Sequence, residues 1–195
     1  MTEAKHSGSN PPNWLTGQLL IAMPAMGDSR FVQSVILVCS HTEEGAMGVV
    51  VNHPLRAPKF ADLMSQLDVS PSPPRRELPL GVGGPVDETR GFVLHSADWI
   101  SDTSLQVDDT LALSANLDIL QAVAAGGGPE KAVLLLGYAG WGEGQLDQEM
   151  RQNSWLSVAA DDALVFDTAY STKWQRALAK LGIDPGMLSG AAGRA

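Results

Sequence analysis

The sequence predicts an α+β fold with mixed, mainly antiparallel meandering sheets and a few helices packed on them. Apolar, β-branched runs come in pairs joined by short turns, as in residues 34–41 and 48–52. Helical spacing of apolar residues recurs in only a few segments, of which 60–67 is one. A doubly wound parallel sheet would require regular alternation of strands and helices, and the chain lacks it.

The apolar runs and the turn residues between them predict the elements in chain order. Gly45 is the expected positive-φ residue of the hairpin that joins 34–41 to 48–52. The charged segment 87–90 is interpreted as a turn between two strands, and Asp161-Asp162 as another. Strands are predicted over 14–23, 34–41, 48–52, 80–86, 91–96, 108–114, 132–137, 155–160 and 163–168, and helices over 60–67, over 116–125, after Gly144 and over 171–182, where Gly182 ends the last.

The 195 residues are within reach of one domain, which we expect over 14–195 after a disordered tail over 1–13. The tail has no apolar core of a secretory signal. No apolar stretch approaches the roughly 18 residues that suggest a membrane span, so we expect no membrane partner. Cys39 is the single cysteine, which rules out an intrachain disulfide and fits a reducing cytoplasm.

The charge balance argues against nucleic acid as a direct partner. The chain has 13 basic and 22 acidic residues, a net charge of −9. An acidic excess works against binding to a polyanionic backbone. The one adjacent basic pair, Arg75-Arg76, lies in a proline-rich loop and is interpreted as solvated.

The glycine-rich stretch 137–150, GYAGWGEGQLDQEM, follows an apolar run and precedes a helix. Its spacing is G-x-G-x-G, which is not a dinucleotide fingerprint, and Glu143 would put a negative charge where a pyrophosphate must lie. We therefore expect no cofactor and interpret the stretch as a sharp reversal. A positive φ at Gly140 would follow, and Gly140→Val would then cost about 1–3 kcal/mol.

Cys39 and His41 are two apart on a predicted strand and should share one face. A nucleophile–base pair is one interpretation, and a buried structural cysteine is the favoured one. A zinc site would want about four ligands, and there is no second cysteine. His53 and His95 also follow strands and could meet His41 in one cleft. No complete catalytic or metal-binding motif is present.

Four blocks of sequence resemble the YqgE/AlgH family of bacterial proteins: residues 19–55, GGPV at 83–86, GFVLHS at 91–96 and residues 137–156. The resemblance implies a single α+β domain with a partly open barrel-like element and a cytoplasmic location. It implies no established activity, since members of the family are labelled either as uncharacterised or as transcriptional regulators. It brings no agreed catalytic residues. Asp147 stands where members often carry Glu, and the chain ends in GRA where GHA is familiar.

We predict a non-enzymatic binding or regulatory domain that acts through a protein or small-molecule partner. The alternative is a hydrolase that uses Asp28, His41, His95 and the 140–145 loop. Any functional surface should lie where the loops 23–31, 41–48, 83–85 and 141–145 meet, because loops on a rigid sheet usually carry binding groups. The candidate surface residues are Asp28, His41, Asn52, His95, Trp141 and Gln145, with no catalytic or metal-binding residue assigned.

Overall fold

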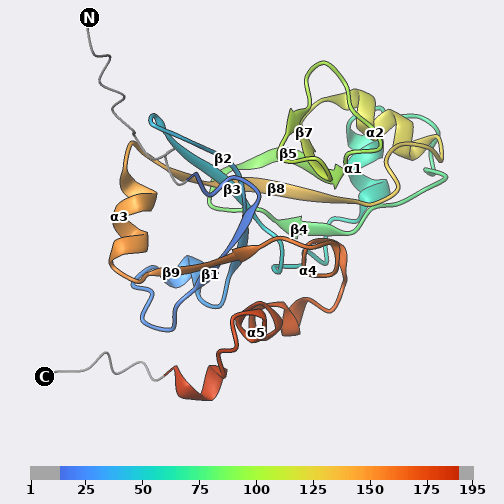
Figure 1. The fold of residues 1–195 in the computed structure, drawn as a ribbon. Coiled ribbons are helices and arrows are strands. Elements are labelled where there is room, and N and C mark those ends of the chain that lie inside the picture. Colours follow the sequence, from blue (N-terminus) through green and yellow to red (C-terminus); the bar gives the residue numbers. More distant parts are fainter. Residues whose placement is uncertain (1–13, 189–195) are drawn as a thin grey trace, which may run out of the picture.

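The computed structural model describes residues 14–188, so the predicted tail over 1–13 and the terminal GRA lie outside the described residues. The strands are β1 (Gln18–Ala22), β2 (Val35–Thr42), β3 (Gly45–Val50), β4 (Leu80–Val82), β5 (Val86–Ser96), β6 (Leu105–Gln106), β7 (Leu111–Ser114), β8 (Ala132–Trp141) and β9 (Trp155–Ala159). They form one sheet in the order β6-β7-β5-β8-β3-β2-β1-β9, and β4 pairs with β8. Only the β4–β8 pairing is parallel. The predicted α+β class is confirmed, and the sheet does not close into a barrel (Figure 1).

Five helices cover this sheet: α1 (Phe60–Gln66), α2 (Leu117–Ala124), α3 (Gln145–Arg151), α4 (Asp162–Phe166) and α5 (Tyr170–Lys180). Two 3-10 turns, η1 (Ser29–Phe31) and η2 (Pro185–Met187), complete the described chain. α1 and α2 pack on β5 and β8 through one apolar cluster, while α3 packs on β1, β2 and β9 through another. A third cluster joins α4 and α5 to the remaining face of the sheet.

The strand β8 links the two halves of the molecule (Figure 1). Residues 132–136 pair with β5, and residues 139–141 pair with β3. The sequence predicts that this strand ends at Gly137, but the chain only bends there, with φ +72°, and pairing continues to Trp141. The predicted reversal at Gly140 is therefore wrong, because the hairpin β2–β3 supplies a partner for residues 139–141.

Two further segments differ from prediction. The charged residues 87–90 do not form a turn: they lie inside β5, where the register against β8 shifts and Asp87 takes φ +49°. Residues 163–168 do not form a strand. Asp161 accepts a hydrogen bond from the N–H of Leu164 and begins α4, whose buried side chains face the core. The predicted hairpin glycine is confirmed, with Gly45 at φ +141°.

α5 is attached to the sheet by two buried donors. The Nζ of Lys173 donates to the carbonyls of Val51 at 3.0 Å and Val165 at 2.9 Å, and the indole of Trp174 donates to the carbonyl of Ala22 at 2.8 Å. Lys173 is fully buried. Burial penalises the charged ammonium and lowers the pKa of Lys173 to about 8.

We expect Gly137→Ala to destabilise the fold by about 1–3 kcal/mol, because a positive φ disfavours a side chain. An added Cβ would also clash with the carbonyl oxygen of Gly84. Gly140→Ala is the matched control, since its Cβ would meet only the Tyr138 ring at 3.3 Å. Urea unfolding of both variants measures the difference. Equal midpoints for the two would contradict this account of the bend.

We expect the buried ammonium of Lys173 to make stability depend on pH. Between the folded pKa of about 8 and the ordinary value of 10.5, the unfolded chain holds the proton and the folded chain releases it. The free energy of unfolding should therefore rise with pH across this window. Urea titrations of the parent and of Lys173→Met, which cannot titrate there, test it. Parallel pH curves for the two proteins would contradict the prediction.

Candidate functional site

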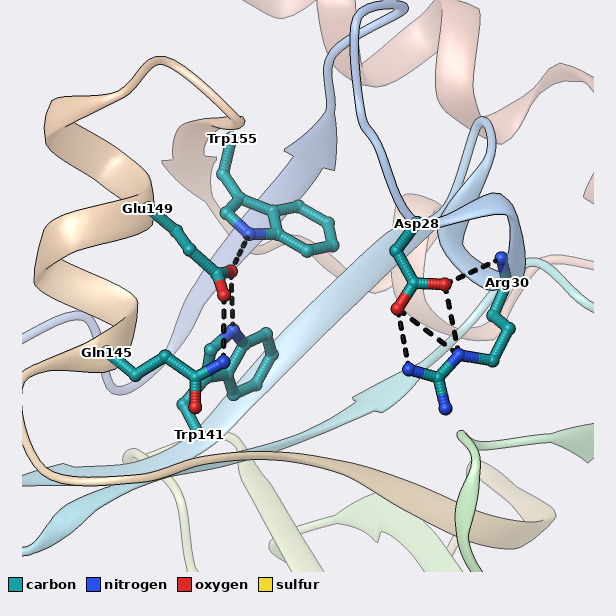
Figure 2. Close-up of polar contacts among 6 residues, drawn as sticks. All are labelled: Asp28, Arg30, Trp141, Gln145, Glu149 and Trp155. Carbon is teal, nitrogen blue, oxygen red and sulfur yellow. Dashed lines mark hydrogen bonds and ion pairs between the residues drawn. The ribbon is translucent and has the colours of Figure 1, made fainter.

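Three of the four predicted loops border one cavity of about 330 Å³, which we call the indole groove. The loops 23–31, 83–85 and 141–145 each contribute side chains or backbone to it, together with the C-terminal end of α3. Figure 2 shows the two sides: Asp28 and Arg30 from the first loop lie across from Trp141, Gln145 and Glu149. The lining residues are Met26, Asp28, Arg30, Phe31, Pro85, Val86, Gly140, Trp141, Gln145, Glu149, Gln152, Ser154 and Trp155.

The carboxylate of Glu149 organises one wall of the groove (Figure 2). Its Oε2 accepts from the indole Nε1 of Trp141 at 2.9 Å and from that of Trp155 at 2.8 Å. Its Oε1 accepts from the side-chain amide of Gln145 at 2.9 Å. Gln145 in turn accepts from the N–H of Gly142 at 3.0 Å. One side chain thus joins β8, α3 and β9.

The local sequence explains why this carboxylate reaches its partners. Gly144 takes a left-handed conformation, with φ +64°, and starts α3 directly after β8. Gln145 and Glu149 are four apart, so they lie on one face of that helix. Trp155 opens the next strand, four residues after the helix ends at Arg151. Both indoles are nearly buried, at 7% exposure for Trp141 and 2% for Trp155.

Aromatic rings continue this wall toward the first loop. Trp141 and Trp155 meet edge to face with their centroids 6.0 Å apart, and Phe31 meets Trp155 in the same way at 5.7 Å. Such T-shaped pairs are favourable because the edge of one ring faces the electron-rich face of the other. This wall of the groove is therefore aromatic and held in a fixed geometry.

A charged pair lies on the opposite side. Asp28 caps the turn η1 by accepting from the N–H of Arg30 at 3.0 Å, and it also accepts from the guanidinium, with Nη2 at 2.6 Å. The Arg30 side-chain hydrogen bond lowers the pKa of Asp28. The side chains are 63% exposed for Arg30 and 34% for Asp28. Solvated pairs of this kind add little stability, so the two groups can exchange partners at low cost.

The fourth predicted loop borders an adjoining, more open cavity of about 670 Å³, which we call the hairpin groove. It shares Val86, Gly140 and Trp141 with the indole groove. The guanidinium of Arg90 lies over the ring of Phe92, 5.0 Å from its centroid. Within residues 14–188 no carboxylate forms an ion pair with it.

His41 lies outside both grooves and contacts Trp14 and Leu15, where the described part of the chain begins. Its Nδ1 accepts from the N–H of Leu15 at 3.2 Å, and its ring meets Trp14 edge to face at 5.2 Å. The other ring nitrogen, Nε2, is 3.5 Å from a carboxylate oxygen of Asp147 on α3. Since Nδ1 accepts, Nε2 carries the proton and points at that carboxylate.

The predicted shared face of Cys39 and His41 is wrong. The register of β2 against β3 shifts between Val38 and Ser40, and the extra residue of this irregularity reverses the alternation of side chains. Cys39 is buried in the core cluster that includes α5, while His41 faces Leu15. Burial also raises the pKa of the Cys39 thiol to about 12, so it is not a thiolate at neutral pH.

The last two candidate residues lie apart from the grooves as well. Asn52 accepts from the N–H of Val35 and donates to the carbonyl of Gln33, both at 2.8 Å, which fixes the start of β2. His95 is fully buried on β5, hydrogen-bonded to Ser114 and Ser96. Of the candidate residues, the structure brings together Asp28, Trp141 and Gln145, and leaves His41, Asn52 and His95 elsewhere.

Glu149, Trp155 and Arg30 are groove residues that the sequence reasoning missed. The spacing of Gln145 and Glu149 was a usable signal, because i, i+4 polar pairs meet on a helix. Nothing in the sequence reveals that two indoles from different strands converge on one carboxylate. Within the described residues, no group of three His, Cys, Asp or Glu side chains could hold a metal ion, and no helix is both long and apolar enough to cross a membrane.

The described architecture can be compared with known proteins. Residues 19–186 match the model of the AlgH-like family. The chain belongs to that family. The UPF0301 protein of Rhodospirillum rubrum is 50% identical over 191 residues, covering 98% of this chain and 97% of the relative. The UPF0301 protein of Nitrobacter hamburgensis is 50% identical over 202 residues, covering 100% of this chain and 94% of the relative.

Solved structures agree with this assignment. The solution structure of the AlgH protein from Pseudomonas aeruginosa is 40% identical, covers 100% of both chains and superposes with a TM-score of 0.77. A crystal structure of a Corynebacterium diphtheriae protein is 20% identical, covers 84% of this chain and 85% of that one, and has a TM-score of 0.63, so it shares the fold. The AlgH-like family is thus supported by sequence and by architecture.

Substitutions of Glu149 should show how much the hydrogen bonds of its carboxylate contribute to the free energy of unfolding. We expect Glu149→Met to lower the free energy of unfolding by about 2–5 kcal/mol, because each unpaired buried indole N–H costs about 1–3 kcal/mol. Glu149→Gln retains one acceptor oxygen and should lose less. Urea unfolding followed by tryptophan fluorescence measures both. If the two variants unfold like the parent, the carboxylate does not hold the indoles.

Proposed function

We propose that this AlgH-like protein is a binding or regulatory domain and that the indole groove is its recognition surface. The observation that supports the proposal most is the convergence of three loops on one cavity with a rigid aromatic wall and an exposed ion pair. A rigid apolar wall beside a few polar groups is typical of binding sites. Every polar atom that holds the wall already has a partner, whereas Asp28 and Arg30 remain solvated.

The partner that fits best is a protein segment with an acidic group. The indole and hairpin grooves adjoin through Trp141, and together they offer about 330 and 670 Å³ of neighbouring space. An extended peptide can occupy both, with its side chains against the aromatic rings. Arg90, which pairs with no carboxylate of the described chain, can receive an acidic side chain. A net charge of −9 favours a protein over nucleic acid as the direct partner.

A regulatory role and a cytoplasmic location belong to the same proposal. The regulation of transcription for which some members of the family are labelled would be exercised through this protein partner. A reducing compartment agrees with a single, buried cysteine thiol. A hydrolytic site at the converging loops finds no support in the geometry, because Asp28, His41 and His95 each bind different residues.

Photo-crosslinking in bacteria that express the chain tests the surface. A benzoylphenylalanine replaces Gln152, an exposed residue of the indole groove, and in a matched variant it replaces Gln121, an exposed residue of α2. We expect a protein adduct from position 152 and none of the same mass from position 121. Adding Asp28→Asn and Arg30→Gln should lower the yield at least about fivefold, equivalent to about 1 kcal/mol.

Two results would overturn the proposed surface. One is the same adduct at the same yield from both positions. The other is an adduct from position 152 whose yield does not change when Asp28 and Arg30 are replaced. Circular dichroism of each purified variant establishes that the fold is intact, so that a lost adduct reports on binding.

A further inference from the structure

His95 and Ser114 form a hydrogen-bonded pair in the other half of the molecule. They lie on the adjacent strands β5 and β7, with His95 Nε2 2.9 Å from Ser114 Oγ. The other ring nitrogen, Nδ1, is 2.9 Å from the carbonyl oxygen of Ser96. A carbonyl can only accept, so Nδ1 carries the proton and Nε2 is free to accept from the serine.

The hydroxyl of Ser114 is oriented from its other side as well. Ser104 Oγ lies 2.8 Å from Ser114 Oγ. Because Ser114 donates its proton to His95, the Ser104 hydroxyl donates to Ser114. The arrangement therefore has a hydroxyl on Ser114 and a neutral imidazole on His95 that is positioned to take its proton. The carbonyl of Ser96 fixes the orientation of that imidazole. These three parts form the pattern of an activated nucleophile. Burial lowers the pKa of His95 and keeps the ring neutral.

Ser114 also lines a cavity of about 300 Å³ between α1 and α2, which we call the helix cavity. Its walls are mainly apolar, with Leu63, Leu120 and Leu134 among them. Leu67 and Leu117, at 48% and 49% exposure, border the same cavity and give it an open, apolar rim. An alkyl chain can enter between the two helices and bring a polar end to Ser114.

The connection after Ser114 leads into the N-terminus of α2. β7 ends at Ser114, and α2 begins two residues later with Asn116 as its cap. The Asn116 side chain accepts from the N–H of Ile119. The N–H groups of Leu117 and Asp118 belong to the first turn and have no acceptor within the helix. Amides at a helix N-terminus can stabilise the oxyanion of an acyl-transfer intermediate.

We propose that Ser114 and His95 form a serine acyl-hydrolase site whose substrate is an ester with an unbranched acyl chain held in the helix cavity. Ser114 Oγ attacks the ester carbonyl carbon, and its proton passes to His95 Nε2. The carbon–oxygen bond to the leaving alcohol then breaks, and the alcohol takes that proton. Water, deprotonated by the same nitrogen, attacks the carbonyl carbon of the acyl-serine. The bond to Ser114 Oγ breaks, Oγ takes the proton back from His95 Nε2, and the carboxylic acid is released. This activity lies beyond the proposed binding function and does not depend on it.

The chain provides a matched comparison in a second Ser–His pair. Ser34 Oγ lies 3.3 Å from His53 Nε2, and Ser34 is buried to the same degree as Ser114, at 0% and 1% exposure. His53 lines a small cavity of about 120 Å³, but Ser34 does not. No hydrogen bond orients the other nitrogen of His53 among the described residues, so this pair lacks both the fixed tautomer and a place for substrate. It should not react.

The test combines a fluorophosphonate probe with p-nitrophenyl acetate and octanoate. We expect the parent chain to be phosphonylated at Ser114, as located by peptide mass spectrometry, and to hydrolyse octanoate at least about tenfold faster than acetate, as two or more additional buried methylenes allow. Ser114→Ala should abolish both signals, and His95→Gln should lower hydrolysis roughly 100-fold. Ser34→Ala should react like the parent.

The parent alone can overturn the proposal, so the test does not depend on how well a variant folds. A folded parent that the probe leaves unmodified at Ser114 contradicts the nucleophile. Hydrolysis that persists in Ser114→Ala, with the melting transition retained, contradicts the site. Equal rates on acetate and octanoate contradict the role of the helix cavity. The assay contains no partner protein, so its outcome does not depend on the proposed binding surface.

Discussion

Glu149 is the residue on which the indole groove depends. Its one carboxylate accepts hydrogen bonds from side chains of β8, α3 and β9, and all three donors come from separate elements of the chain. Two of them are nearly buried indoles, whose N–H groups would otherwise lack an acceptor. Because the same bonds set the positions of Trp141 and Trp155, the wall of the groove and the packing of α3 are fixed together. A rearrangement of the wall would have to break the two partly buried indole hydrogen bonds at once.

Both proposed sites include residues of β8, at different positions along the strand. Its residues Leu134 and Leu136 line the helix cavity, while Gly140 and Trp141 line the two grooves. The bend at Gly137 lies between these segments and brings the carbonyl of Gly84 close to the chain. The two sites share this strand, and Arg90 borders both the hairpin groove and the helix cavity.

The spacing of apolar residues predicts the elements that local interactions determine. It fails where a strand far away in the sequence determines how long an element continues. The helix over 60–67 and the hairpin at Gly45 follow from spacing and turn chemistry, and both are confirmed. The continuation of β8 past Gly137 depends on β3, which the local pattern does not include. The groove was predicted from the residue types of its loops, and three of them do converge. Glu149 was missed because its donors are six and eight residues away on other elements.

The histidines illustrate the same limit at the level of chemistry. His41, His53 and His95 follow or end strands in the sequence, and nothing there distinguishes them. In the folded chain, His41 accepts an amide N–H at Nδ1, so its proton lies on Nε2 and the ring acts as a donor toward Asp147. His95 has the opposite tautomer, because Nδ1 faces a carbonyl, and only this ring presents a free lone pair to a hydroxyl that also borders a cavity. The register of β5 against β7 makes that difference, since Ser114 pairs with Val93 and His95 lies two residues farther along β5 on the same face of the sheet. The capacity for base chemistry therefore arises from strand pairing, and no histidine has it by its place in the sequence alone.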